Sequence, residues 1–318
     1  MARPIYDLLL KGQNVLISGH KGCTYRIDKP LTKNVFKAYI EGTSIPVMLK
    51  TEDHPALYRR EVNVYQFNCV RQSPYIRSLR EIVANGTDKC MVFEWMDSDL
   101  WSLREQKQPP NSPFLKVVAK SVLNALAAFS DMDGHGSAVH TGQPYMPTAD
   151  CETVYQLIDS RLIPAGEPRD YRLQGLSIRA PEIWMGYPPS PACDVWSVGV
   201  SLAHFLSAKC LFGITDMKFR VTPVPIETSQ AAYSIAKIIQ LIGPLSRKED
   251  AKFTEEFDIA EALVEMGTIT MGSLEEELAK AEAGQNCLEF IRYLLTLDPD
   301  KRPTVKQALE HTWFRDTE

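Results

Sequence analysis

Few side chains in this sequence stand at a spacing that by itself specifies a reaction. The run Gly199-Val200-Ser201-Leu202-Ala203 resembles a nucleophilic serine turn, but it lies inside a helical pattern, whereas that turn must join a strand to a helix. His135 and His140 are close in sequence, but no array of cysteines or carboxylates accompanies them to complete a zinc site. The phosphate-binding pattern G-x-x-x-x-G-K-[ST] is absent. Acyl transfer, a zinc centre and a P-loop therefore have no support.

Three segments late in the chain are specific when taken together. They are Arg179-Ala180-Pro181-Glu182-Ile183-Trp184, then Cys193-Asp194-Val195-Trp196-Ser197-Val198-Gly199, and finally Leu294-Leu295-Thr296-Leu297-Asp298-Pro299-Asp300-Lys301-Arg302-Pro303-Thr304 with His311-Thr312-Trp313-Phe314. In this order and spacing they resemble the C-terminal lobe of eukaryotic protein kinases of the serine/threonine type, which carry an A-P-E motif. The resemblance runs from about Tyr25 to Phe314 and implies a buried ion pair between Glu182 and Arg302.

The resemblance also implies a nucleotide site in the first hundred residues. Kinase catalysis needs a lysine for the phosphates, a carboxylate on Mg²⁺, a second metal ligand and a base for the substrate hydroxyl. Lys50, in Val47-Met48-Leu49-Lys50, resembles the phosphate-binding lysine of the third strand, and Glu61 resembles its partner on the first large helix. The residues alone also allow an exposed lysine on an edge strand and a solvated helical glutamate.

The segment Phe93-Glu94-Trp95-Met96 resembles the hinge of a kinase, whose backbone groups would face an adenine. Glu94 and Met96 are therefore expected to bind nucleotide. Asp97 or Asp99 falls where a ribose contact would lie. The alternative is a plain connection between two lobes with an acidic surface.

The place of the catalytic H-R-D-L-x-x-x-N motif is taken by residues 139–147. Here Gly142 replaces the catalytic aspartate and Pro147 replaces the asparagine that binds the second metal ion. Glycine and proline carry no side-chain carboxylate or amide, so neither can orient a hydroxyl or bind Mg²⁺. The resemblance leaves no catalytic base at this position, although Asp150 could approach it from a few residues away.

The metal-binding and phosphate-binding motifs are also altered. Asp159, in Leu157-Ile158-Asp159-Ser160-Arg161, keeps the aspartate of D-F-G and could bind one Mg²⁺. Arg161 replaces the glycine, and a structural pair of Asp159 with Arg161 or with Lys50 is the simpler interpretation. Between Ile27 and Phe36 there is no glycine to let backbone N–H groups approach phosphates.

The elements that would position these residues fall into two groups. Alternating apolar residues predict strands over 25–27, 35–40 and 46–50, and a short apolar run predicts another over 89–96. Helices are predicted over 56–68 and 117–129. A Gly-rich stretch and a Pro-rich loop with Pro144 and Pro147 follow, then a strand over 154–158, and helical patterns dominate from there to the end. We expect a two-lobed α+β protein-kinase-like fold: a β-rich N-lobe over 1–96 and a larger helical C-lobe over 97–318. Residues 246–284, which are acidic, are the best candidate for an exposed insertion.

Composition narrows the class of protein further. The chain has 318 residues and a formal net charge of −5, which disfavours nucleic acid or a membrane surface as its main partner. Seven scattered cysteines without a CxxC pair favour reduced thiols in the cytoplasm or nucleus. No signal-peptide core and no apolar run of membrane-spanning length is visible.

Two functions from different classes fit these observations. The favoured one is a catalytically impaired pseudokinase, similar to fungal kinase-like proteins, that acts as a binding or regulatory scaffold with weak or absent binding of ATP and Mg²⁺. Its protein partners are unspecified, and the acidic 246–284 segment could dock a basic one. The alternative is an active serine/threonine kinase that transfers the ATP γ-phosphate to protein. A kinase-fold enzyme with other nucleotide chemistry is a third possibility.

Overall fold

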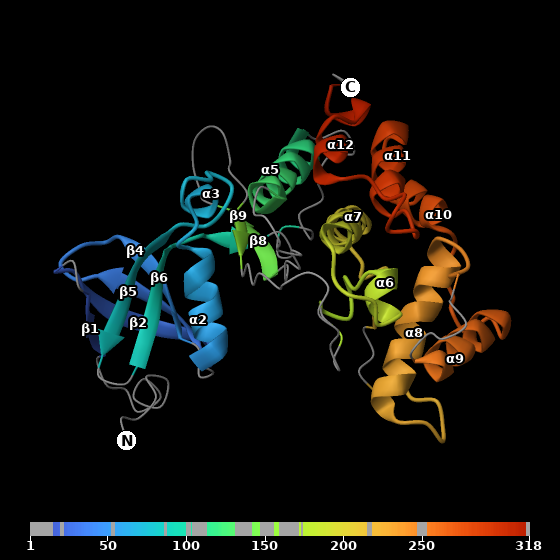
Figure 1. Ribbon diagram of the computed structural model, residues 1–318, viewed down its shortest axis with the longest axis horizontal. Helices are drawn as coiled ribbons and strands as arrows, with labels where there is room; N and C mark the ends of the chain where they lie inside the picture. Colours follow the sequence, from blue (N-terminus) through green and yellow to red (C-terminus); the bar gives the residue numbers. More distant parts are fainter. Residues whose placement is uncertain are drawn as a thin grey trace.

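The computed structural model describes residues 15–19, 22–51, 55–85, 88–99, 103, 113–130, 142–146, 156–158, 172, 174–214, 218–246 and 253–315. An antiparallel sheet forms the N-terminal part, and helices form the C-terminal part (Figure 1). This is the expected mixed α+β arrangement. The predicted lobe boundary at 96–97 falls in the connection between strands β6 and β7, and it stays a prediction.

Six antiparallel strands build the N-terminal sheet in the order β1-β2-β3-β4-β6-β5. Their bounds are β1 Leu16–Ser18, β2 Thr24–Thr32, β3 Val35–Ile40, β4 Pro46–Thr51, β5 Leu79–Asn85 and β6 Asp88–Glu94. The sequence predicted β2, β3, β4 and β6 but missed β1 and β5. One apolar face of the sheet forms its own buried cluster, which includes Ile17, Phe36, Leu49, Val83 and Val92.

Helix α2, Pro55–Val64, is shorter than the helix predicted over 56–68. The chain leaves helical geometry near Phe67, whose φ of −69° and ψ of 133° are extended, and a second helix α3 follows over Asn68–Arg71. Tyr58, Glu61 and Val64 of α2 are buried. Because these residues are three apart, they share one helix face.

A small second sheet follows, in the order β7-β8-β9. Its strands are β7 Ser98–Asp99, β8 Gly142–Met146 and β9 Gln156–Ile158. Most of the segment expected to be a catalytic loop is therefore a strand. The β8–β9 register shifts between Gly142 and Tyr145. That irregularity contains Pro144, which has no N–H to give to a ladder.

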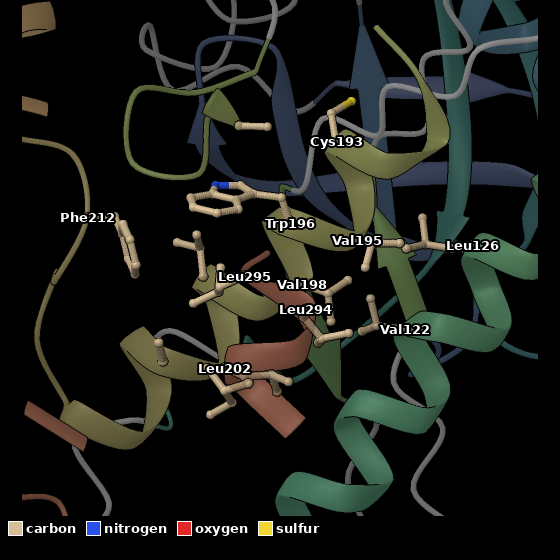
Figure 2. Packing of buried hydrophobic residues seen from close by; sticks show 14 of the residues in the cluster. Val122, Leu126, Cys193, Val195, Trp196, Val198, Leu202, Phe212, Leu294 and Leu295 are labelled. Atoms are coloured by element: carbon tan, nitrogen blue, oxygen red, sulfur yellow. The ribbon is translucent and has the colours of Figure 1, made fainter. Parts of the chain in front are cut away.

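The helical part consists of α5 Pro113–Ser130, α6 Pro181–Trp184, α7 Pro191–Ser207, α8 Ile226–Leu241, α9 Thr254–Glu265, α10 Leu274–Ala279, α11 Gln285–Leu294, α12 Val305–Leu309 and the 3₁₀ turn η1 Thr312–Phe314. Helix α7 lies at its centre, and twelve of its residues are buried. Figure 2 shows Val198 of α7 near Val122 of α5 and Leu294 of α11, while Trp196 lies near Leu295 and Phe212.

Gly199 lies inside α7, so the serine pattern around Ser201 is part of a buried helix, as predicted. A Cβ at Gly199 would lie 2.9 Å from Leu295 side-chain atoms. The glycine is needed for close approach between α7 and α11, and this explains the pattern without any catalytic role.

The acidic segment 246–284 contains α9 and α10. Buried side chains of Phe257, Leu263, Leu274 and Leu278 anchor these helices to the C-terminal core. The segment is thus less exposed than expected, because only one face of each helix reaches solvent. Its status as an insertion stays a prediction. Within the described residues, no helix is both long and apolar enough to span a membrane.

Candidate functional site

Lys50 and Glu61 form a close ion pair between the sheet and the first long helix. Lys50 Nζ lies 2.8 Å from Glu61 Oε1, and the two side chains are 14% and 2% exposed. Lys50 is the last but one residue of β4, and Glu61 is on the buried face of α2. The exposed-lysine alternative is therefore wrong, and the sequence paired these two residues correctly. Binding of phosphate by Lys50 stays a prediction.

Glu94 and Met96, which were predicted to form the hinge, lie at and just beyond the end of β6, and Met96 is buried. The backbone carbonyl of Glu94 accepts hydrogen bonds from Nε and Nη2 of Arg77 at 2.8 and 2.5 Å. Its carboxylate accepts one from the Ser78 N–H at 2.9 Å. Sequence reasoning missed Arg77, because an arginine next to an apolar strand gives no sign of where its long side chain ends.

The face of the sheet that carries Lys50 is crowded with large side chains. Val35 lies opposite Lys50, and Lys37 lies opposite Met48 in the next register position of the same face. Lys37 Nζ also lies 4.6 Å from the centre of the Trp95 ring. Met48 and Lys37 therefore share a face of the sheet with Lys50, and Lys37 also contacts Trp95, the residue after β6.

The connection between β2 and β3 is a short turn, Lys33-Asn34, without glycine. Thr51 donates its backbone N–H to the Asn34 carbonyl at 2.8 Å, which ties the turn to the end of β4. A phosphate cradle requires backbone N–H groups pointing into open space, which a glycine-rich loop provides. The turn at Lys33-Asn34 contains no such glycine, and the absence of phosphate binding here stays a prediction.

The remaining site residues are only partly described. Gly142 in β8 lies opposite Ile158 in β9, the residue that precedes Asp159. Asp99 in β7 lies opposite Tyr145. Asp159, Asp150, Pro147 and Arg161 lie outside the described residues, so the predicted metal ligand is untested. No cluster of three metal-binding side chains occurs among the residues that are described.

The fit of this region to ATP and Mg²⁺ is mixed. The Lys50–Glu61 pair has the geometry that a phosphate-binding lysine needs. The glycine-free turn and the occupied carbonyl of Glu94 do not fit a nucleotide. Among the described residues, the pair therefore fits a nucleotide site, and the turn and the Glu94 carbonyl do not.

The predicted pair of Glu182 and Arg302 is confirmed. Arg302 Nη1 and Nη2 donate to the two carboxylate oxygens of Glu182 at 2.7 and 2.9 Å, and both side chains are buried. Arg302 also donates to the carbonyls of Ala192, Thr296 and Leu297, so the pair joins α6, α7 and the segment before α12.

A buried polar network precedes α6. Gln174 has φ of 61°, and its amide nitrogen donates to the Cys193 carbonyl and to Ser197 Oγ. Its amide oxygen accepts the Ala180 N–H at 2.9 Å, while Arg179 donates to its backbone carbonyl at 2.8 Å. A residue in the left-handed region is strained unless its surroundings hold it, and these contacts hold Gln174 in place.

An arginine stack joins the same segment to α9. Arg172 Nη2 lies 2.5 Å from Glu256 Oε2, and Arg172 Cζ lies 3.7 Å from the centre of the Phe253 ring. Arg179 Cζ lies 4.4 Å from the Trp184 ring. Burial, together with the charge of Arg172, lowers the pKa of Arg179 to about 10. The sequence showed only an acidic run at 255–256 and gave no indication of this contact.

Known proteins resemble this chain in both sequence and fold. Residues 164–314 match the protein kinase domain family. The chain is 24% identical to cyclin-dependent kinase G-1 of Oryza sativa subsp. indica, over 95% of this chain and 42% of that protein. It is 26% identical to serine/threonine-protein kinase SSN3 of Yarrowia lipolytica, over 75% of this chain and 60% of that one.

A solved structure, the yeast RNA Pol II CTD kinase CTDK-1 complex, has a similar fold. It aligns with a TM-score of 0.68 and 18% identity over 92% of this chain and 93% of that one. The chain spans about two fifths of the rice relatives named cyclin-dependent kinase G-1 and G-2, with 42% and 41% of their lengths covered.

Proposed function

Because this chain is a member of the eukaryotic protein kinase family, with its two-part kinase fold, we propose that it is a catalytically impaired kinase that acts as a binding or regulatory protein. The observation that carries the proposal is Gly142. By the family resemblance it takes the place of the catalytic base, and it lies in β8 opposite Ile158, the last residue of β9 before Asp159. Glycine has no group that could take the proton of a substrate hydroxyl.

Protein kinases as a family use ATP and Mg²⁺. In this chain we propose that binding of both is weak or absent. The glycine-free turn at Lys33-Asn34 offers no cradle for the phosphates, and the Glu94 carbonyl already accepts two hydrogen bonds. Any residual site would consist of Lys50, Glu61, Glu94, Met96, Asp99 and Asp159, with Asp159 as the metal ligand.

The alternative is an active serine/threonine kinase that transfers the γ-phosphate of ATP to protein. One observation favours it: the Lys50–Glu61 pair is formed at 2.8 Å, as an active site would require. In such an enzyme a group other than residue 142 would have to orient the substrate hydroxyl. Asp150 is the nearest acidic residue in sequence.

Two measurements test the proposal. In the first, thermal unfolding is followed with millimolar ATP, with and without Mg²⁺, for the wild type and for Lys50→Met. A ligand at about 100 times its dissociation constant adds about 2.7 kcal/mol, which would raise the midpoint by a few degrees. We expect a smaller shift than this, and none that depends on Mg²⁺.

In the second, transfer of labelled γ-phosphate to casein and histone is compared between the wild type, Lys50→Met and Gly142→Asp. We expect no transfer above the Lys50→Met background. Gly142→Asp should restore little, because Pro147 and the glycine-free turn remain. Transfer by the wild type that disappears in Lys50→Met would establish the enzyme instead.

We further propose that the protein works through protein partners in the cytoplasm or nucleus. Several relatives are named as cyclin-dependent kinases, and the comparable solved structure is a complex. The exposed face of α9 carries Glu255, Asp258, Glu261 and Glu265, which favours a basic partner. Reversing Glu255 and Glu265 to lysine should weaken any such complex without unfolding α9. Unchanged binding would exclude this surface.

A further inference from the structure

Arg77 is a buried arginine directly beside the hinge. Its side chain is 2% exposed, and its Nη1 lies 3.2 Å from Met48 Sδ. Its guanidinium carbon lies 5.9 Å from the centre of the Phe93 ring. Both Nε and Nη2 point to one acceptor, the backbone carbonyl of Glu94, at 2.8 and 2.5 Å.

These two bonds leave the Glu94 carbonyl without free accepting capacity. A carbonyl oxygen has two lone pairs, and here two N–H groups of one cation use them. Hydrogen bonds from an ionised donor are roughly twice as strong as neutral ones. The amino group of a nucleobase, which is a neutral donor, would have to displace a stronger donor to reach this oxygen.

Moving the Arg77 guanidinium away from the Glu94 carbonyl is energetically costly. Its guanidinium is enclosed by the Met48 side chain, the Phe93 ring and the end of β6. Withdrawing it would break both charge-assisted hydrogen bonds to the Glu94 carbonyl in a buried environment. The carbonyl is therefore occupied in the ground state, whatever else enters the space beside the hinge.

We propose that Arg77 determines the base preference of this chain. Because it occupies the Glu94 carbonyl, that oxygen cannot accept a hydrogen bond from a purine amino group. Any nucleotide bound at the hinge is then held without recognition of that amino group. The inference rests on the proposed nucleotide contact at the hinge, and it explains why that contact would be weak. It assigns a specificity-determining role to a residue outside the motifs of the sequence.

The test compares ATP with purine riboside 5′-triphosphate, which lacks only the amino group. Dissociation constants are measured by titration calorimetry for the wild type, Arg77→Met and Arg77→Lys. Arg80→Met serves as the matched control, because Arg80 is an exposed arginine of the adjacent strand β5. The wild type and the control should bind the two nucleotides within twofold of each other, or bind neither.

Arg77→Met should bind ATP about tenfold more tightly than the analogue, since the freed carbonyl can now accept the amino group. Arg77→Lys, which keeps a charge but supplies a single donor nitrogen, should give a smaller preference and provides the test if Arg77→Met does not fold. Tenfold preference for ATP in the wild type would overturn the inference. So would variants that gain no preference, including variants that bind neither nucleotide.

Failure of this inference and failure of the proposed function are separable. If the wild type transfers phosphate from ATP and from the analogue equally well, the protein is an enzyme and the role of Arg77 stands. If it transfers none and prefers ATP tenfold, impaired catalysis stands and the role of Arg77 is wrong.

Discussion

At the scale of single residues, the Glu182–Arg302 pair is the clearest determinant of stability. Both side chains are buried, at 3% and 0% exposure. Arg302→Met would leave the Glu182 carboxylate buried without its partner, which costs about 3–5 kcal/mol of unfolding free energy. Urea denaturation measures this loss. The control is Lys301→Met, because Lys301 is 79% exposed in its pair with Asp298, and such pairs contribute about 0.2–1 kcal/mol. Equal losses in both variants would contradict the prediction.

His204 predicts a pH dependence of stability. Burial, with a smaller effect of the Lys237 charge, lowers the pKa of His204 to about 3, and its Nε2 accepts the Phe212 N–H at 2.9 Å. An unfolded histidine titrates near pH 6.5, so below that pH the unfolded chain binds the extra proton and the native chain does not. The free energy of unfolding should therefore fall by up to about 1.4 kcal/mol per pH unit between about pH 6 and pH 4.

His204→Gln keeps an acceptor for the Phe212 N–H but removes the titrating group. Urea denaturation at a series of pH values should show a shallower slope in this variant by about one proton. An unchanged slope would mean that His204 is protonated in the native protein.

What sequence can predict at this scale depends on how far a side chain reaches. Lys50, Glu61, Glu182 and Arg302 stand in recognisable motifs, so their pairing followed from the resemblance. Arg77 stands in no motif, and its role depends on a side chain that crosses from the start of β5 to the end of β6. A contact of this kind can be identified only from the structure.

At the scale of elements, α9 contributes a buried ion pair that its acidic composition does not indicate. Its Glu256 holds Arg172, and both side chains are about nine-tenths buried, at 13% and 10% exposure. A double-mutant cycle with Arg172→Met and Glu256→Gln should give a coupling of about 1–3 kcal/mol in urea denaturation. Glu255→Gln on the exposed face is the control and should change stability by less than about 0.5 kcal/mol. Coupling near zero would leave the Phe253 ring as the main support of Arg172.

The elements also explain where sequence patterns misled. The acidic run in α9 suggested an exposed insertion, yet the same helix carries Phe257 and Leu263 on a buried face at helical spacing. The acidic residues of α9 favoured an exposed segment, although the apolar residues on the opposite face of the helix indicate burial. In β8 the pattern around Pro144 suggested a loop, but a strand tolerates proline at an edge or irregularity, and the register shift there provides one.

At the scale of the whole molecule, one apolar core connects the two parts. It runs from Met48 and Phe93 in the sheet through Leu123 of α5 to Trp196 of α7. This continuous core holds the sheet and the helices in one fixed arrangement.

This continuity predicts that the two parts unfold together. Leu123→Ala removes a side chain that is fully buried at 0% exposure, so it should cost about 2–5 kcal/mol. Hydrogen exchange in β6, which reports on the sheet, and in α7, which reports on the helical part, should show the same loss of stability. The exposed Lys120→Ala on the same helix should shift neither. If β6 kept its protection while α7 lost its own, the sheet would be an independent unit, and a partner could bind either part alone.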